Sequence, residues 1–240
     1  MIDQKMNPMN NVPTPKYTTK QHIDHYRKEE IPILMELIES ELNKRQQLIV
    51  KLALFGGLRR GEVAGIASDV LDFENNRITI KRSLQVSSKE GLRLKETKSE
   101  DTRTITIPEN LMKDLHEYYI KKLNLRMEMG NLWKGFQDIN GEEVFMLFAN
   151  EYGIPIRPDS ITQFWNRFNE RNKGEIRRIR FHDLRHSSAT IILSTSNTPI
   201  TMRTVQKRLG HKDIKTTLKF YSHVTEEDDR RASDVFNEFL

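Results

Sequence analysis

The stretch FHDLRHSSATIILSTSNTPITMRTVQKRLGHKDIKTTLKFY, residues 181–221, carries most of the recognisable chemistry of this chain. Its apolar residues recur at helical spacing and predict helices over 183–195, 202–209 and 214–222. Side chains that can bind phosphate, carry a proton or attack as a nucleophile stand at the edges of these runs: His182, Arg185, His186, His211 and Tyr221. Such a concentration within about forty residues is unusual for a purely structural segment.

The chain around this stretch predicts a mostly helical domain with a small sheet. Helical periodicity covers 29–47, 48–55, 111–123 and 161–168, with Asp159 as a candidate cap of the last helix, and a final helix is expected over 226–239. Alternating apolar residues near 78–80, 92–94 and 105–107 predict antiparallel strands, and a further short strand is expected at 144–148. Residues 1–28 lack periodicity and are predicted to be a linker or remnant arm before one domain over 29–240.

Charge and composition favour a polyanionic partner. The whole chain of 240 residues carries +5, whereas the segment 160–220 alone carries +9, so the remainder is net acidic. Nucleic acid and a merely solvated cationic face both fit this block. The absence of cysteine excludes disulfides, thiolate nucleophiles and cysteine-based metal sites. No apolar run reaches the ~20 residues of a membrane span, and the start lacks a signal-peptide core, so we expect a cytoplasmic protein without a membrane partner.

The sequence HDLRH, residues 182–186, has three interpretations. Two histidines four apart share a helix face and loosely resemble a zinc motif, although Arg185 would set a fixed positive charge beside the ion. Alternatively, His182 and Arg185 both face an anion, because a guanidinium matches phosphate oxygens and an imidazole exchanges protons near neutral pH. Taken alone, a helix-capping pair is the commonest explanation.

The other candidate residues also have ordinary explanations when each is taken singly. Arg59 follows a Gly pair and could form an exposed salt bridge with Glu62. Lys98, with Lys95 nearby, could be a solvated turn lysine. His211 could end a helix after Gly210, and Tyr221 could be a core aromatic.

Taken together and in this order, the motifs resemble the tyrosine recombinases of the phage integrase family. The matching pieces are GGLRRGE around Arg59, TKSEDTRTITIP around Lys98, HDLRH at 182–186 and LGHKDIKTTLKFY ending at Tyr221. The resemblance implies a mixed α+β catalytic domain, mostly helical, with a small three-stranded antiparallel sheet. It also implies that the helical core-binding domain that usually precedes this domain is absent, since only the predicted arm stands before residue 29.

The resemblance assigns a role to each motif residue. Tyr221 would attack a DNA phosphodiester and form a 3′-phosphotyrosyl link, His182 would take its proton, and Lys98 would protonate the leaving 5′-oxygen. Arg59, Arg185 and His211 would stabilise the charge on the phosphate without a metal ion or other cofactor. Glu62 is expected to hold Arg59, and His186 to pack between helices. Basic residues expected to bind DNA are Arg177, Arg178, Arg180, Lys207, Arg208 and Lys212.

By the same resemblance, the partner is double-stranded DNA and the reaction is site-specific recombination, integrating or excising a phage or mobile element. A homotetramer is expected on DNA and a monomer when free, with accessory DNA-bending proteins as possible partners. The acidic end at 226–238 would dock on a neighbouring subunit, or fold back on its own basic surface. The rival functions are a type IB topoisomerase, a DNA-binding regulator with a degenerate site, and a zinc hydrolase. Substituting Arg185 by Ala or Tyr221 by Phe is expected to abolish strand cleavage and leave folding largely intact.

Overall fold

The computed structural model describes residues 24–88, 91–96, 102–195 and 200–210. It begins with a short 3-10 helix, η3 (Lys28–Glu30), followed by α1 (Ile31–Glu41) and α2 (Lys44–Phe55). The predicted helix over 29–47 therefore ends too late in the sequence. The chain leaves α1 after Glu41, and Asn43 caps the start of α2. The Asn43 side chain accepts a hydrogen bond from Gln46 N at 3.1 Å, and Gln46 Oε1 accepts one from Asn43 N at 3.2 Å. This reciprocal capping box fixes where α2 begins.

The strands form two separate antiparallel units. A three-stranded sheet has the order β1 (Leu71–Asp72), β2 (Arg77–Ile80) and β5 (Arg103–Thr106), with Ile78 opposite Ile105. The other unit is a hairpin of β3 (Arg82–Ser87) and β4 (Gly91–Glu96), with Leu84 opposite Leu94. The predicted three-stranded antiparallel sheet is confirmed, but the alternation at 92–94 belongs to the hairpin.

The remaining helices surround this framework. They are α3 (Arg60–Ala64), η4 (Ser68–Val70), α4 (Glu109–Met129), η6 (Gly130–Leu132), α5 (Pro158–Arg171), α6 (Asp183–Thr195) and α7 (Met202–Leu209). The predicted bounds of α6 and α7 are confirmed. Asp159 lies in the first turn of α5 behind Pro158 and does not cap it. The strand expected at 144–148 is wrong: within these residues only Met146 forms a β-bridge, to Ala67, and that bridge is isolated. The helices expected over 214–222 and 226–239 lie outside the described residues.

The core is centred on α2, and residues ahead of α1 contribute to it. Trp165 of α5 is fully buried, and its indole Nε1 donates to the carbonyl of Ile179 at 2.9 Å. Tyr26 is also fully buried; its hydroxyl donates to the carbonyl of Arg177 at 2.7 Å and its N–H donates to Ser187 Oγ at 2.9 Å. The packed structure therefore begins before the predicted boundary at residue 29.

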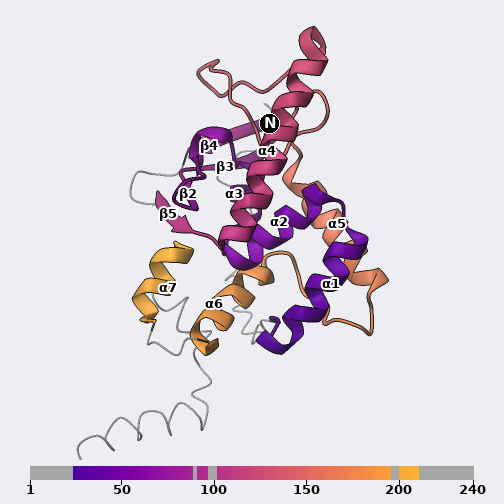
Figure 1. Cartoon of the computed structure of the whole chain (residues 1–240), viewed down its shortest axis with the longest axis vertical. Helices are drawn as coiled ribbons and strands as arrows, with labels where there is room; N and C mark the ends of the chain where they lie inside the picture. Colours follow the sequence, from indigo (N-terminus) through magenta and orange to yellow (C-terminus); the bar gives the residue numbers. More distant parts are fainter. Residues whose placement is uncertain (1–23, 89–90, 97–101, 196–199, 211–240) are drawn as a thin grey trace, which may run out of the picture.

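The last two described helices are held against the earlier half of the chain. Figure 1 shows α6 beside α2 and α7 below β5, and both pairs are in contact. A small apolar cluster of Ala189, Val205 and Leu209 joins α6 to α7. Elements distant in sequence thus meet where α7 ends. Within the described ranges, no helix is both long and apolar enough to cross a lipid bilayer.

Candidate active site

Three consecutive backbone carbonyls at the end of α7 each accept a hydrogen bond from a different arginine. The carbonyl of Arg208 accepts from Arg103 Nε at 2.9 Å, and that of Gly210 accepts from Arg59 Nη2 at 2.8 Å. Between them, the carbonyl of Leu209 accepts from Arg185 Nη2. A helix C-terminus leaves its last carbonyls without helical partners and carries a partial negative charge, so it suits three cations.

Glycines make this close approach possible. Gly210 caps α7 in the left-handed conformation, with φ of 64°, and a Cβ there would lie 2.9 Å from Arg103 Nη1. Gly57 also has a positive φ, of 65°, and a Cβ there would lie 2.4 Å from Leu209 Cδ2. The carbonyl of Gly57 accepts from Arg185 Nη1 at 2.6 Å, which joins the turn before α3 to α6. Both glycines therefore serve tight packing as well as backbone freedom.

Glu62 joins two of the three arginines. Its Oε1 accepts from Arg59 Nη1 at 2.7 Å and from Arg103 Nη1 at 3.0 Å. Its Oε2 accepts from Arg59 N at 2.9 Å and from Arg103 Nη2 at 2.7 Å. Burial alone would raise the pKa of Glu62, but the hydrogen bonds and charges of Arg103 and Arg59 outweigh it and lower the pKa to about 2. The carboxylate is thus ionised throughout the neutral range.

Arg185 and Arg59 differ in exposure. Arg185 is 1% exposed, and its burial, followed by the charge of Arg59, lowers its pKa to about 9. The side chain of Arg59 is 42% exposed. Arg59, Arg103 and Arg185 together face the single carboxylate of Glu62, so the cluster keeps an excess positive charge. Arg59 is its accessible member and can meet an anion.

His182 and His186 lie at the start of α6 with their rings perpendicular and their centroids 5.0 Å apart. His182 is exposed as a whole residue, but the partial burial of its imidazole, followed by the charge of Arg185, lowers its pKa, so the imidazole is neutral at pH 7. His186 is buried, and its pKa is lowered to about 4, chiefly by burial and then by His182. A neutral, accessible imidazole at position 182 is able to take up a proton.

Asp183, the first residue of α6, pairs with Arg180. Its carboxylate accepts from Arg180 N at 3.0 Å, from Arg180 Nε at 2.9 Å and from Arg180 Nη2 at 2.9 Å. Because Arg180 engages both carboxylate oxygens, this pairing argues against Asp183 as a catalytic base beside zinc. Within the described part of the chain, no group of three or more His, Cys, Asp or Glu residues is arranged to hold a metal ion.

The residues predicted to bind DNA have different surroundings. Arg177 pairs with Glu30 at 3.3 Å, and Arg178 pairs with Glu170 at 3.5 Å with its side chain 70% exposed. Arg208 donates from Nη1 to the carbonyl of Thr106 and from Nη2 to that of Phe55, both at 2.9 Å. These bonds favour a structural role for Arg208, whereas the exposed Arg178 and Arg180 remain suited to phosphate.

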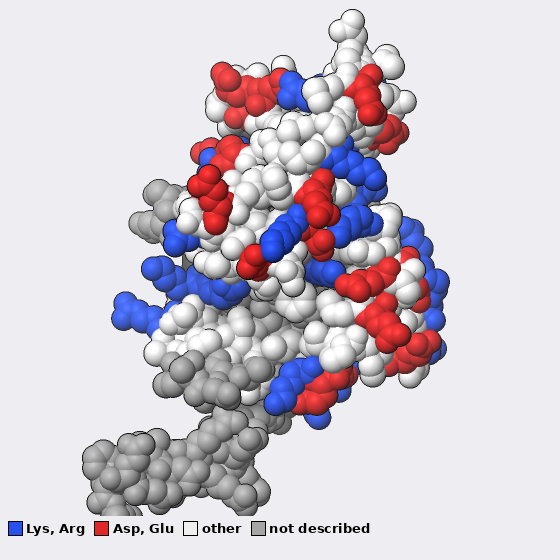
Figure 2. All heavy atoms as spheres, in the orientation of Figure 1, with Lys and Arg blue, Asp and Glu red and all other residues white. Residues whose placement is uncertain are grey.

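Part of the predicted set lies outside the described residues: Lys98, His211, Lys212 and Tyr221. Two of these adjoin the cluster along the chain, since His211 follows Gly210 directly and Lys98 precedes β5 by five positions. On the face shown in Figure 2, basic side chains project from the left edge, between the strands and α7. Lys207 lies in the last turn of α7, on the same side of the molecule.

Arg103 is the one residue of the cluster that the motifs did not identify. Exposure alternates along β5, and Arg103 takes an inward position two residues before the buried Ile105. A charged residue at an inward position of a strand almost always has a partner. The charge at an inward strand position was therefore the signal in the sequence that Arg103 has a buried partner. In the structure this partner is Glu62.

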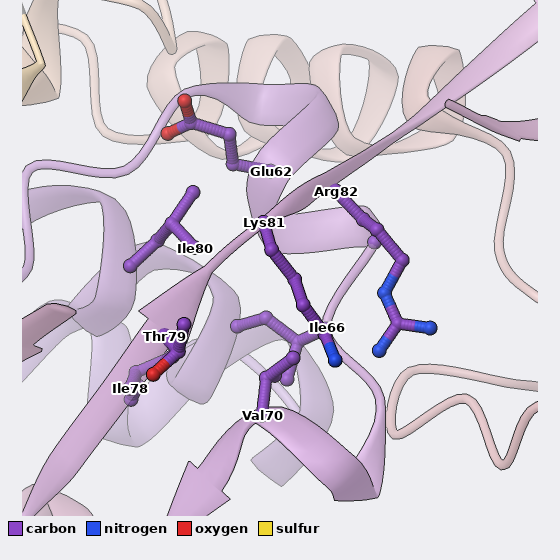
Figure 3. Close-up of a pocket in the computed structure, with 9 residues that line it drawn as sticks. Glu62, Ile66, Val70, Ile78, Thr79, Ile80, Lys81 and Arg82 are labelled. Carbon is purple, nitrogen blue, oxygen red and sulfur yellow. The ribbon is translucent and has the colours of Figure 1, made fainter. Parts of the chain in front are cut away.

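A small cavity behind Glu62 does not extend the site. Figure 3 shows Glu62 at the top of it and Arg82 at the right, with Ile78 and Ile80 on the left and Val70 below. Its volume is about 10 Å³, enough for at most one water molecule. Any chemistry of the cluster therefore takes place on its open side, where Arg59 and His182 are accessible.

A model of the phage integrase family matches residues 25–228. The chain belongs to this family, and its fold is that of the mostly helical tyrosine recombinase catalytic domain. It is similar to the tyrosine recombinase XerC-like protein of Caldanaerobacter subterraneus, with 24% identity over 236 residues covering 95% of this chain and 57% of that protein. The prophage ps2 probable integrase of Lactococcus lactis is 27% identical over 210 residues, covering 85% of this chain and 52% of that protein.

A solved structure gives the same fold. The Tn1549 transposon integrase in complex with transposon right end DNA superposes with a TM-score of 0.72 at 22% identity, covering 97% of this chain and 71% of that chain. This chain spans about half the length of the curated relatives that it matches.

Proposed function

We propose that this chain is a site-specific DNA recombinase that cleaves and rejoins duplex DNA through a 3′-phosphotyrosyl intermediate, in the integration or excision of a phage or other mobile element. The observation that carries the proposal is the cluster at the end of α7. Arg59 and Arg185 stand 126 positions apart, yet they donate to the adjacent carbonyls of Gly210 and Leu209. Family membership and the DNA complex of the Tn1549 integrase support the same function.

The reaction proposed here is a transesterification. The Tyr221 oxygen attacks the scissile phosphorus, the bond from phosphorus to the 5′-oxygen breaks, and a 3′-phosphotyrosyl ester forms. The tyrosine proton goes to His182, whose lowered pKa keeps it neutral and able to accept. Lys98 supplies a proton to the leaving 5′-oxygen. Attack by a 5′-hydroxyl of another strand reverses these steps and releases the enzyme, so the bond energy is kept.

The phosphate needs cations because negative charge grows on its non-bridging oxygens in the transition state. Arg59, the accessible guanidinium of the cluster, and Arg185, from its buried position, are assigned to these oxygens. His211, next to Gly210, is assigned a further hydrogen bond. Each such donor typically contributes about 3 kcal/mol of barrier lowering, roughly a hundred-fold in rate.

DNA binding is assigned to Arg177, Arg178, Arg180, Lys207 and Lys212, with a smaller part for Arg208. Recombination joins two duplexes, so a homotetramer is proposed on DNA and a monomer without it. Accessory DNA-bending proteins and docking of the acidic segment 226–238 onto a neighbouring subunit belong to the same proposal. Sedimentation of the chain with and without cleavable DNA tests the change of state.

The test of the activity is covalent capture. The chain is incubated in EDTA with a pool of nicked duplexes of randomised sequence, denatured in SDS, and the protein-linked DNA is sequenced. A recombinase yields an adduct through a 3′-phosphate without metal, and the Tyr221→Phe variant yields none. A zinc hydrolase gives free ends only, a regulator gives no product, and a type IB topoisomerase gives adducts without sequence enrichment. An adduct from Tyr221→Phe equal to that of the parent chain would refute the assignment.

A further inference from the structure

Arg103 lies within the cluster but has no role in the reaction described above. It is the first residue of β5 and is 8% exposed. Four contacts hold it: two to the carboxylate of Glu62, one to the carbonyl of Arg208, and a close approach to Gly210. Every polar contact made by its guanidinium thus goes to a group that also borders Arg59 or the end of α7.

The geometry gives Arg103 control over Glu62. Each oxygen of Glu62 accepts one bond from Arg59 and one from Arg103, so the carboxylate is clamped between them. When a buried carboxylate loses one of two cationic partners, its negative charge is no longer fully compensated. The carboxylate then shifts toward the partner that remains or toward water. Either shift moves Arg59, whose side chain reaches only Glu62 and the carbonyl of Gly210 in the described structure.

Only an arginine can make this set of contacts. The guanidinium presents a fixed planar fork, with Nη1 and Nη2 directed to the two oxygens of Glu62 and Nε directed to the carbonyl of Arg208. A lysine ammonium keeps the charge but is a single point, so it cannot bridge the carboxylate and the α7 carbonyl together.

Arg103 also ties the start of β5 to the cluster. In the sheet, Arg103 pairs with Ile80 of β2, and its side chain reaches Glu62, which binds Arg59. One side chain therefore links the β2–β5 pairing to the anchor of Arg59. The close approach of Gly210 places the chain leading to His211 against the same guanidinium.

We propose that Arg103 is a positioning residue of the recombinase site, which acts through Glu62 and the end of α7 to hold Arg59 against the scissile phosphate. It does not touch the DNA. This inference rests on the proposed function, since it assigns the means by which that function orients its phosphate-binding arginine.

The test compares Arg103→Met and Arg103→Lys with Arg82→Met. Arg82 is a matched control, because it is a largely buried sheet arginine, 10% exposed in its side chain, that pairs with Asp69 and lines the small cavity shown in Figure 3. The substrates are a nicked duplex enriched by the capture experiment and the same duplex with a methylphosphonate at the scissile position. This replacement removes the negative charge that Arg59 has to meet.

Single-turnover adduct formation is measured at saturating DNA, beside DNA affinity and the melting temperature. For the ordinary phosphate we expect Arg103→Met to slow cleavage on the order of 100-fold and Arg103→Lys on the order of 10-fold. DNA affinity should change less than about 3-fold, because phosphate contacts outside the site dominate binding. On the methylphosphonate the deficit of both variants should shrink to less than about 5-fold. The Arg82→Met variant should cleave both substrates at the parent rate.

A purely structural role predicts something different. Equal losses of cleavage rate on the two substrates would overturn the proposal, and so would parent-like cleavage by folded Arg103→Met and Arg103→Lys. In both cases adduct formation by the parent chain would still support the proposed function. If Arg103→Met does not fold, Arg103→Lys alone decides between these outcomes, because its charge is retained. Absence of any adduct from the parent chain would instead overturn the proposed function itself.

Discussion

At the scale of single residues, the burial of Arg185 changes what its substitution is expected to do. The Arg185→Ala variant would leave the carbonyls of Gly57 and Leu209 without their donors and open a void around a side chain that is 1% exposed. We now expect a loss of about 3 kcal/mol in the free energy of unfolding, in addition to the loss of cleavage. Urea unfolding followed by tryptophan fluorescence measures it.

The control for this prediction is Arg178→Ala, whose side chain is 70% exposed and should change stability by less than about 0.5 kcal/mol. Parent-like stability of Arg185→Ala would contradict the structural role. From the sequence, Arg185→Ala is expected to leave folding largely intact, and the burial of this side chain argues against that expectation. Only the packing of α6 against α2 and α7 reveals the burial.

The pKa of His186 implies an acid-sensitive fold. Since the folded-state pKa is lowered to about 4, mainly by burial, the unfolded chain takes up a proton below pH 6.5 while the folded chain does not. Stability should therefore fall as the pH drops from 6.5 towards 4, by about 2 kcal/mol at pH 5. Urea midpoints at pH 7.5 and pH 5 measure the loss. His186→Asn should reduce it, whereas the same substitution at the exposed His116 should leave it as in the parent.

Residue roles were only partly accessible from the sequence. The motifs led to Arg59, Glu62, His182 and Arg185, and the structure brings these four to the end of α7 together with Arg103. Arg103 was not found, because its importance comes from a contact with Glu62, 41 positions earlier. A contact between residues so far apart in the sequence leaves no local signal other than a charge at an inward strand position.

At the scale of elements, the start of α2 depends on one cap. We expect Asn43→Ala to lower the free energy of unfolding by about 1 kcal/mol, because it removes the acceptor for Gln46 N and leaves a helical N–H unpaired. The control is Ser40→Ala at the end of α1, where the hydroxyl only bonds back to carbonyls of its own helix. That change should stay within a few tenths of a kcal/mol. Equal effects of the two substitutions on chemical unfolding would contradict the capping role.

Element boundaries were predictable where a cap or a breaker stands in the sequence. The bounds of α6 and α7 were correct, and Thr201 caps α7 by accepting from Thr204 N at 3.2 Å. The break between α1 and α2 was missed, although Asn43 and Gln46 form a visible capping pair. The strand prediction at 144–148 was wrong for another reason. An apolar run indicates burial, and Met146 to Phe148 are indeed buried, but a buried segment does not have to pair with a strand.

At the scale of the whole molecule, the residues before α1 are part of the folded structure. Tyr26 is fully buried and bonded to Arg177 and Ser187, 151 and 161 positions away. We expect Tyr26→Ala to destabilise the fold by about 3 to 4 kcal/mol, and Tyr26→Phe by about 1 kcal/mol through the lost hydroxyl bond alone. Thermal and urea unfolding measure both.

The matched control is Tyr152→Ala, since Tyr152 is 38% exposed and should lose far less. A loss for Tyr26→Ala as small as that expected for Tyr152→Ala would contradict the stabilising role of Tyr26. This packing could not be predicted from the sequence, because a single tyrosine in a polar segment has no periodicity. Its partners lie in the last third of the chain and become visible only in three dimensions.

The three carbonyls that end α7 have a consequence for the living cell. Their arginine partners stand just before α3, in β5 and in α6, whereas the acceptors themselves are among the last described residues to be made. On the ribosome, Glu62 is available to Arg59 and Arg103 early, but the three carbonyls are synthesised only after all three arginines. With the chemistry proposed for this protein, a nascent polypeptide that stops before residue 208 lacks the completed cluster.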